Sequence, residues 1–407
     1  YKMKLVLFYC DFLAPSGFSR VSEEVVNRLE TWCERENVRI DICATNFGKN
    51  EKVIVSKYIT AYNARLFAHN EKDMWYRDGF LKLLQSKPYD LVWILNDFPV
   101  ITPLNGLLKR IREQKKQLPL KTHNQIVHPE FKVIFYTPID SLPPKSWFKD
   151  ISEFDEIVTY TEYAKKEIQK RSKTSVNVIP HGFDTKSFYR IDDKAKLRKK
   201  YKLPIDKYIF GTVNKNHARK DIGSTLIAFA RFKEKYGSNA VLYLHTYHSD
   251  PTGINIHQAA ERLGLKFNKD YFLPLEERYK NAEYTPSDMN EVYNCMDCFI
   301  TTSMAEGWGL TLSEAMCCEL PVIYGNHTSF KEIMQGDGKP VKTLHEHIQI
   351  YDGEGVRFKL DINETVERMQ ECFISTNKNV KYTKQLEKYD WDKISLSWQI
   401  IFNKHLR

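Results

Sequence analysis

The sequence lacks a long apolar stretch, a dense block of like charges and a complete cysteine metal-binding motif. Its longest hydrophobic runs fall far short of the ~20 residues that cross a bilayer. The opening run KLVLFYC also lacks the length and the small-residue site of a cleavable signal. These absences argue against a membrane-spanning or secreted protein. We expect a cytoplasmic protein that is soluble or held peripherally at a membrane.

Charges of both signs are scattered along the chain. There are 61 Lys and Arg residues against 52 Asp and Glu residues, which gives a net charge of +9. Because no five or six like charges follow one another, a solvated surface is a better interpretation than a nucleic-acid-binding face. The positive balance still favours an anionic substrate or an anionic membrane surface as partner.

Several cofactor classes lack their sequence signals. The eight cysteines lie mostly within apolar patterns, which indicates reduced thiols rather than a disulfide framework. Cys295 and Cys298 have C-x-x-C spacing, but no second pair completes a zinc site. No G-x-G-x-x-G follows a predicted strand, so a dinucleotide dehydrogenase is poorly supported. The Asp390-Trp-Asp392 triplet opens a predicted helix and suits helix capping better than metal binding. We expect neither a required metal nor a tightly bound cofactor.

The composition is sufficient for two folded domains. Hydrophobic residues make up 42% of the 407 residues and aromatic residues 13%. Such a length suggests roughly two domains of about 150–200 residues each. Short runs rich in Val, Ile, Phe and Tyr alternate with helical patterns, and this alternation predicts parallel sheets with helices on both faces. Strands are expected at 3–9, 38–45, 89–96, 131–138, 156–161, 208–214, 240–247, 297–303 and 321–325. Helices are expected at 21–32, 192–201, 222–237, 289–296, 310–319 and 391–406.

A segment dense in Pro, Gly and Asp separates the two series of strands, at residues 176–188. The sequence therefore predicts an α/β protein with two doubly wound, Rossmann-like domains, at residues 1–185 and 186–388. Residues 389–407 form a final helix. In such domains the functional edge lies at the carboxyl ends of the strands.

The stretch EGWGLTLSEAM carries two acids, Glu306 and Glu314, around a glycine turn. It follows a predicted strand and begins a predicted helix, so Glu306 should lie at the carboxyl end of that strand. The backbone from Gly307 to Thr311 would then direct its amides out of a helix N-terminus, a geometry that binds phosphate. Two alternatives remain: Thr311 and Glu314 also fit a capping box, and Glu306 also fits an ordinary loop acid.

A basic cluster follows the first strand of the second domain, in the stretch GTVNKNHARKD. Lys215, Arg219 and Lys220 lie at the predicted carboxyl end of that strand. Next to a helix N-terminus they could clamp a diphosphate, because Arg and Lys neutralise a leaving group as its charge grows. A solvated basic loop is the simpler alternative.

Together these motifs resemble the retaining nucleotide-sugar glycosyltransferases of family four, which have the GT-B fold. The resemblance is carried by two glutamates separated by seven residues, the following Ala-Met and the Pro-Val-Ile strand. The stretches VIPHGFD and ARKD are similar to the family's linker and phosphate motifs. The resemblance to the family is strong over residues 176–335 and weaker before them. It implies two domains facing each other across a cleft, with the last helix crossing back to the first domain.

The resemblance also implies roles for individual residues. Glu306 matches the acid that contacts the donor sugar near the reaction centre, and Glu314 the acid that hydrogen-bonds the ribose. Lys220 matches the diphosphate lysine, and Gly17 resembles a glycine in a phosphate-approaching loop. The resemblance also implies that the loop and helix start around the sugar and phosphate are formed by Gly307, Trp308, Gly309, Leu310 and Thr311.

Three positions depart from the family pattern. Asn214 stands where a second phosphate-binding arginine is usual, with Lys215 beside it. His181 replaces the usual linker asparagine. Asp140 follows the strand at 131–138 without the histidine that often precedes it. This aspartate has two interpretations: it could hydrogen-bond an acceptor hydroxyl or donor sugar, or it could form a turn before Ser-Leu-Pro-Pro.

The resulting hypothesis is a retaining hexosyl- or pentosyltransferase. It would move sugar from a nucleotide-diphosphate sugar, a UDP-sugar first and a GDP-sugar second, to a hydroxyl of a glycan, lipid or glycoprotein. The alternatives are a non-catalytic sugar-nucleotide-binding protein and a GT-B epimerase or phosphorylase. No lysine lies in a context that suggests a pyridoxal Schiff base, and the glutamate motif disfavours both of these enzymes.

Overall fold

The chain divides into two compact units. The computed structural model describes residues 2–47, 52–68, 73, 75–117, 130–237, 239–281, 283–348, 355–376 and 379–406. The first unit holds Tyr1–Ile139, Pro143–His181 and Trp391–Arg407, and the second holds Asp140–Leu142 and Gly182–Asp390. These boundaries differ by a few residues from those expected after residues 185 and 388. Asp140, expected in the first domain, groups with the second unit.

The first unit is built on an eight-stranded sheet with the order β3-β4-β2-β1-β5-β6-β7-β8. Neighbouring strands are parallel except β3 and β4. The strands are β1 (Lys4–Cys10), β2 (Val38–Ala44), β3 (Val53–Ile54), β4 (Ile59–Asn63), β5 (Leu91–Leu95), β6 (Lys132–Thr137), β7 (Glu156–Thr159) and β8 (Val176–Val178). Strand β5 is buried along its whole length, as a strand covered on both faces should be.

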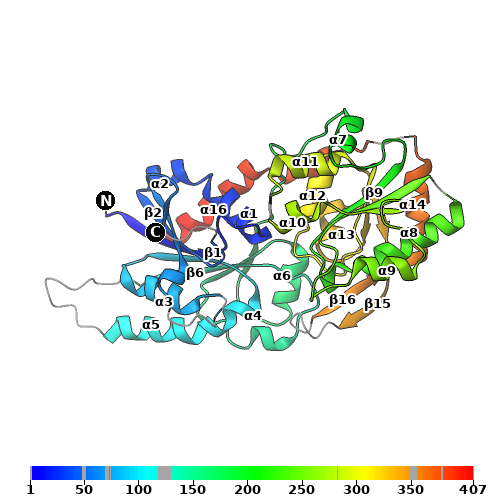
Figure 1. Cartoon of the computed structure of the whole chain (residues 1–407). Coiled ribbons are helices and arrows are strands. Elements are labelled where there is room, and N and C mark those ends of the chain that lie inside the picture. The colour runs from blue at the N-terminus through cyan, green and yellow to red at the C-terminus, as the bar shows by residue number, and fades with distance from the viewer. Residues whose placement is uncertain are drawn as a thin grey trace. The chain divides into compact units, whose positions relative to one another are not determined.

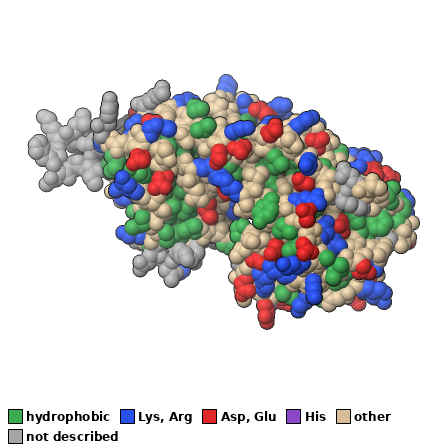
Figure 2. Space-filling view, turned by 90° about the horizontal axis from the view of Figure 1, so that it is seen from above, with side chains coloured by type: hydrophobic (Ala, Val, Ile, Leu, Met, Phe, Trp, Pro, Cys, Tyr) green, Lys and Arg blue, Asp and Glu red, His purple; other side chains and the backbone are tan. Residues whose placement is uncertain are grey.

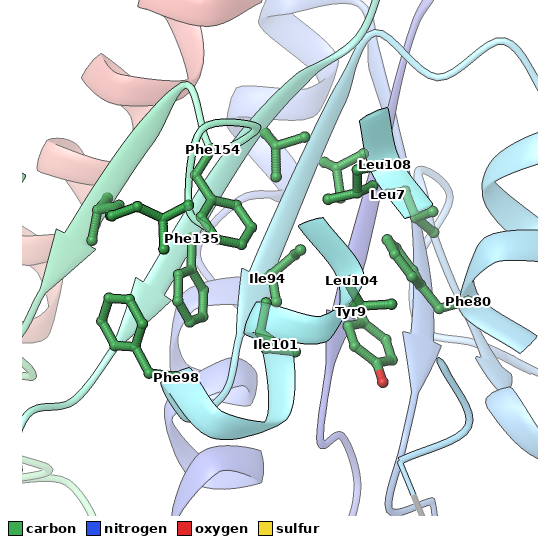
Figure 3. Close-up of a cluster of buried hydrophobic side chains, with 14 of the residues drawn as sticks. Leu7, Tyr9, Phe80, Ile94, Phe98, Ile101, Leu104, Leu108, Phe135 and Phe154 are labelled. Atoms are coloured by element: carbon green, nitrogen blue, oxygen red, sulfur yellow. The ribbon is translucent and has the colours of Figure 1, made fainter. Parts of the chain in front are cut away.

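One face of this sheet is covered by helices that follow its strands (Figure 1). Alternate strand residues point to opposite faces, so Leu7 and Tyr9 of β1 enter this core together. They pack with Phe80, Ile94 and Leu104 in one buried cluster (Figure 3). The helices are α3 (Arg77–Ser86), α4 (Phe98–Ile101), α5 (Asn105–Gln117) and α6 (Glu162–Gln169), with 3-10 turns η1 (Ala64–Leu66), η2 (Thr102–Leu104) and η3 (Lys145–Phe148).

The opposite face of the sheet packs on the last helix, α16. The rings of Phe8 and Trp93 on the sheet lie 5.8 and 5.5 Å from Phe402 and Trp398 of this helix. A short helix near the amino terminus contributes Trp32, which lies 5.5 Å from Phe402. The helices are α16 (Trp391–Leu406), α1 (Gly17–Val26) and α2 (Glu30–Glu36). The single helix expected at 21–32 is thus two helices.

The second unit holds a six-stranded parallel sheet with the order β11-β10-β9-β12-β13-β14. Its strands are β9 (Tyr208–Val213), β10 (Ala240–His245), β11 (Tyr271–Phe272), β12 (Cys298–Ile300), β13 (Val322–Gly325) and β14 (Lys339–Val341). The turn η4 (Ala218–Lys220) follows β9. Beside this sheet the structure has an antiparallel hairpin, β15 (Thr343–Ile348) and β16 (Val356–Leu360), which the sequence did not predict.

Helices of the second unit begin and end at recognisable signals. Helix α11 starts with a capping box between Thr285 and Asp288, and α8 ends at Gly237 in the left-handed region. Phe210 of β9 packs with Phe229 and other residues of α8 in the main core. The helices are α7 (Lys194–Lys200), α8 (Ile222–Tyr236), α9 (Ile256–Arg262), α10 (Glu276–Lys280), α11 (Pro286–Asn294), α12 (Leu310–Cys317), α13 (Thr328–Met334), α14 (Ile362–Ile374) and α15 (Thr383–Lys388).

The distribution of surface charges and the burial of the cysteines agree with what the sequence led us to expect. On the face seen in Figure 2, Lys and Arg side chains are interspersed with Asp and Glu rather than gathered in one patch. All eight cysteines are buried as free thiols. Among the described residues, no helix is both long and apolar enough to span a membrane.

Candidate active site

Two neighbouring strands of the second unit bring the candidate residues together. Strands β9 and β12 are parallel and paired, with Phe299 opposite Gly211. Segments that follow parallel neighbours emerge at the same sheet edge. Lys220 ends the 3-10 turn after β9, and Glu306 lies in the loop between β12 and α12. Residues 86 positions apart in sequence therefore meet at one edge.

Glu306 is the centre of a buried ion cluster. The ammonium group of Lys220 donates a hydrogen bond to Oε1 of Glu306, and Arg219 Nη1 lies 3.3 Å from Oε2. Ser303 Oγ donates to Oε1 at 2.8 Å. Arg219 Nη1 also donates to the carbonyl oxygen of Ala305 at 2.6 Å. The Glu306 side chain is only 10% exposed, so its charge depends on these partners.

The cluster keeps Glu306 ionised. Burial opposes the charge of this carboxyl, but Lys220 and Arg219 outweigh burial and lower its pKa to about 2. The pKa of Lys220 is also lowered, because burial and the adjacent Arg219 disfavour the ammonium more than Glu306 supports it. An anion next to Lys220 would raise the pKa of this lysine and so offset the effects of burial and of Arg219.

Helix α13 hydrogen-bonds to the loop between Glu306 and α12 through Ser329. The hydroxyl of Ser329 contacts the carbonyl oxygens of Glu306 and Trp308, at 2.8 and 2.9 Å. Gly309 caps α12 with φ +100°, a conformation that L side chains rarely adopt. A Cβ at Gly309 would lie 2.4 Å from the ring of Phe330, so the close approach also requires glycine.

The start of α12 has features that would favour an anion. The helix begins at Leu310, and the amides of Leu310 and Thr311 have no acceptor within their own helix, whereas Leu312 N donates to the carbonyl oxygen of Gly309 at 3.0 Å. The helix dipole adds a partial positive charge there. The expected loop residues Gly307, Trp308, Gly309, Leu310 and Thr311 all lie at this point.

Glu314 lies within α12 rather than at its start. Gly309 is the N-cap residue, so Thr311 and Glu314 do not form the capping box that the sequence also allowed. The Glu314 side chain is buried and accepts a 2.6 Å hydrogen bond from the hydroxyl of Tyr293 on α11. The interpretation of Glu314 as a pure capping residue is therefore wrong.

A buried histidine supports the same loop and was not expected from the sequence. Burial lowers the pKa of His327 to about 4, despite the opposing effects of Ser303 and Glu306. The ring is therefore neutral near pH 7, and its Nε2–H donates to the carbonyl oxygen of Ser303 at 3.0 Å. His327 thus fixes the backbone that carries Ser303, the hydrogen-bond donor to Glu306.

The other residues of the basic stretch divide into buried and exposed groups. Asn214 is buried, and its Nδ2 donates to the hydroxyl of Thr212 at 3.0 Å. Lys215 is exposed. The pKa of Asp250 is lowered mainly by hydrogen bonds from Thr252, which outweigh the opposing effect of burial, and Lys215 contributes a smaller lowering. The structure thus brings Arg219 and Lys220 to Glu306, whereas Asn214 bonds to Thr212 and Lys215 acts on Asp250.

Asp140 joins the ion cluster through Arg219. Its Oδ2 lies 3.6 Å from Nε of Arg219 and 3.9 Å from Nη2 of Arg357 on strand β16. Arg357 was missed by sequence reasoning, because the alternation in VRFKL does not distinguish a buried arginine from the partly exposed Lys359 two residues later. Asp140 therefore makes ion contacts outside its own loop, and both interpretations of this residue stay predictions.

Gly17 lies in the first unit, at the first position of α1. The loop before it is organised by Asp11, a buried carboxylate that follows β1. Asp11 accepts hydrogen bonds from the side chains of Ser16, Thr45 and Asn46. Ser16 is in turn the N-cap of α1, so the start of this helix is fixed by the carboxyl ends of β1 and β2.

Comparisons with known proteins show which sequences and structures the chain resembles. Residues 193–339 match the family model described as glycosyl transferases group 1. A probable sucrose-phosphate synthase from Thermosipho melanesiensis is 26% identical over 258 residues, which make up 61% of this chain and 54% of that relative. The chain thus matches about half the length of this curated relative.

Solved structures resemble the whole chain. A sucrose-phosphate synthase from Thermosynechococcus elongatus has a TM-score of 0.68 and 15% identity, with 99% of each chain covered. Anabaena HepE in complex with UDP and glucose has a TM-score of 0.66 and 13% identity, covering 99% of this chain and 100% of that one. The Escherichia coli trehalose-6-phosphate protein bound to UDP-2-fluoro glucose has a TM-score of 0.64 and 12% identity, covering 99% and 98%.

The α/β fold and the family resemblance predicted from the sequence are confirmed. The fold is GT-B, as in these solved structures, and residues 193–339 match the family model for glycosyl transferases group 1. Across the described residues, no group of three or more His, Cys, Asp or Glu side chains could hold a metal ion.

Proposed function

We propose that the protein is a retaining glycosyltransferase that moves a sugar from a nucleotide-diphosphate sugar to an acceptor hydroxyl. The observation that carries the proposal is the cluster of Lys220, Arg219 and Glu306 beside the start of α12. A diphosphate leaving group gains negative charge as its bond to the sugar breaks. Two cations and a helix N-terminus that are already in place stabilise that charge without reorganisation.

The proposed roles follow from this arrangement and from the family resemblance. Lys220 and Arg219 bind the diphosphate, with the backbone from Gly307 to Thr311 on its other side. Glu306 contacts the donor sugar near the reacting carbon, and Glu314 hydrogen-bonds the ribose. Because Glu306 already holds Lys220, little side-chain entropy is lost when the diphosphate arrives.

We choose a UDP-sugar as the donor, with a GDP-sugar as the second candidate. Two of the similar structures carry UDP with glucose or a UDP-glucose derivative, which supports UDP-glucose as the first donor to test. Relatives named as synthases of sucrose phosphate and trehalose 6-phosphate support hexose phosphates as the first acceptors. Hydroxyls of glycans, lipids and glycoproteins follow in the acceptor screen.

We further propose that the reaction takes place in the cytoplasm, in solution or at a membrane surface, and does not involve nucleic acid. Reduced, buried cysteines and a positive net charge of +9 support this setting. Donor binding should not require a metal, because Lys220 and Arg219 supply the cations. Treatment with EDTA should therefore leave turnover unchanged, and a loss restored by Mg²⁺ would overturn this part of the proposal.

The test is a screen of nucleotide sugars for hydrolysis and transfer by the purified chain. We expect release of UDP, dependent on the acceptor, and a product that keeps the donor's anomeric configuration in proton NMR. The Glu306→Gln variant should bind UDP as the wild type does but turn over far more slowly. An inverted anomer would refute the retaining assignment.

Other outcomes identify the alternatives. Binding of UDP-sugars without any turnover would indicate a non-catalytic binding protein. An epimerised nucleotide sugar would indicate an epimerase, and phosphate-dependent cleavage of a glycan would indicate a phosphorylase. No binding of any nucleoside diphosphate would overturn the proposal as a whole.

A further inference from the structure

Arg357 is a buried arginine on the unpredicted hairpin, and only 2% of its side chain is exposed. Its strand, β16, pairs with β15 along one edge. Along the other edge, Val356 exchanges backbone hydrogen bonds with Leu142, and Phe358 N donates to the carbonyl oxygen of Met304 at 3.0 Å. One edge of β16 therefore contacts both the segment that carries Asp140 and the loop that carries Glu306.

The charged side chains form a continuous series. Arg357 Nη2 lies 3.9 Å from Oδ2 of Asp140, and the same oxygen lies 3.6 Å from Nε of Arg219. Arg219 then reaches Oε2 of Glu306 at 3.3 Å, and Lys220 binds the other oxygen of that carboxylate. Three cations thus face two carboxylates, so the group carries one excess positive charge.

Two carboxylates compete for Arg219 in this series. Attraction between opposite charges at these distances is strong when both groups are withdrawn from water. Asp140 shares its charge between Arg357 and Arg219, which weakens its attraction for Arg219. Without Arg357, Asp140 would draw the Arg219 guanidinium toward itself and away from Glu306. The excess positive charge that favours a diphosphate would disappear at the same time.

We propose that Arg357 is a positioning residue of the donor site: it occupies Asp140 and thereby leaves Arg219 directed at the diphosphate. This inference rests on the proposed function, because the diphosphate site is part of that proposal. Arg357 acts through Asp140 and Arg219 and has no direct contact with the reacting atoms in this assignment.

The experiment is a double-mutant cycle read out as UDP affinity by calorimetry. Arg357→Met should weaken UDP binding by about tenfold, within the range by which residues in one ion network couple. In the Asp140→Asn background the same change should cost less than about twofold, because the competing charge is already absent. A purely structural role would weaken binding equally in both backgrounds and would overturn the proposal.

Two further variants keep the test decisive. Lys359→Met removes a partly exposed cation from the same strand and should leave UDP affinity unchanged. Arg357→Lys keeps the charge and should retain UDP affinity within about threefold, and it replaces Arg357→Met if that variant does not fold. A tenfold loss in the lysine variant would overturn the charge argument. If the wild type binds UDP and Arg357→Met binds it equally, this inference alone fails; if the wild type binds no UDP, the proposed function fails with it.

Discussion

The hydroxyl of Tyr293 donates a 2.6 Å hydrogen bond to Oε2 of Glu314. The two residues lie on neighbouring helices, α11 and α12, and both side chains are buried. A buried carboxylate needs hydrogen-bond partners, and this one also fixes the orientation of the Glu314 side chain. Tyr293 therefore presents the acid that we propose to bind the ribose.

We predict that Glu314→Gln weakens UDP affinity by about tenfold, the amount expected when one hydrogen bond to a charged group is lost. Tyr293→Phe should weaken it less, because the carboxylate remains but loses its orienting partner. Calorimetric titration with UDP measures both. Tyr208→Phe is the matched control, since its hydroxyl donates to the carbonyl oxygen of Cys372 away from this helix pair. Unchanged UDP affinity in Glu314→Gln would contradict the ribose role.

Lys220→Ala should lower turnover by a factor on the order of 10²–10³, as when one preorganised donor to a developing anion is removed. The initial rate of UDP release at saturating donor measures this effect. Lys233→Ala removes another lysine from an ion pair, the one with Asp270, and should leave turnover unchanged. Full activity in Lys220→Ala would shift the role to Lys215 or Arg219.

The stability of the fold should depend on pH through Glu306. Its pKa is about 2 in the folded protein, below the ordinary value of 4.5. A carboxyl with a depressed pKa stabilises the fold fully above its unfolded pKa, and this contribution is lost as the pH falls toward the folded value. The wild type should therefore exceed Glu306→Gln in stability at pH 7, and the difference should shrink between about pH 4.5 and pH 2.

Urea unfolding at several pH values tests this expectation. The exposed residue Glu261 provides the control, because Glu261→Gln removes a carboxylate from the surface of helix α9 rather than from the ion cluster. A difference between the wild type and Glu306→Gln that stays constant with pH would show that the ion cluster does not stabilise the folded state.

Gln335 should be a site where glycine stabilises the protein. It ends α13 in the left-handed region with φ +50° and is exposed. Glycine adopts this conformation without the steric cost of a Cβ, so Gln335→Gly should raise the free energy of unfolding by about 0.5–1 kcal/mol. Gln258→Gly is the matched control inside helix α9, where the same change should cost about 1 kcal/mol. Equal effects at both sites in urea unfolding would contradict the backbone argument.

Sequence patterns identified nine strands of the two sheets, but they missed β3, β4, β8, β11 and β14 as well as the hairpin β15–β16. The buried strand LVWIL and its central neighbours form short, nearly continuous apolar runs, which distinguish them clearly from the surrounding chain. The strand TLHEHI mixes polar and apolar residues, and its partner VRFKL also hydrogen-bonds to Met304 and Leu142. Such contacts depend on tertiary structure and leave no periodic signal in the sequence.

The candidate site was predictable where one local motif carried it. Glu306, Lys220 and the glycine turn belong to recognisable stretches, and the pairing of β9 with β12 brings them together. The supporting residues Ser303, Ser329 and His327 act through hydrogen bonds to backbone or side-chain atoms of the loop. Their side chains are common in any loop, so only the three-dimensional arrangement reveals their function.

The packing of α16 on the first sheet has a consequence for biosynthesis. Phe8, Trp93 and Tyr136 of that sheet contact one another and Trp398 or Phe402 of the last helix. A ribosome must add about 200 residues after His181 before Trp391–Arg407 exists, which takes on the order of 10–40 s. During that interval the nascent sheet exposes an aromatic face of the kind that chaperones bind. The first unit is therefore completed only after the second unit has been translated.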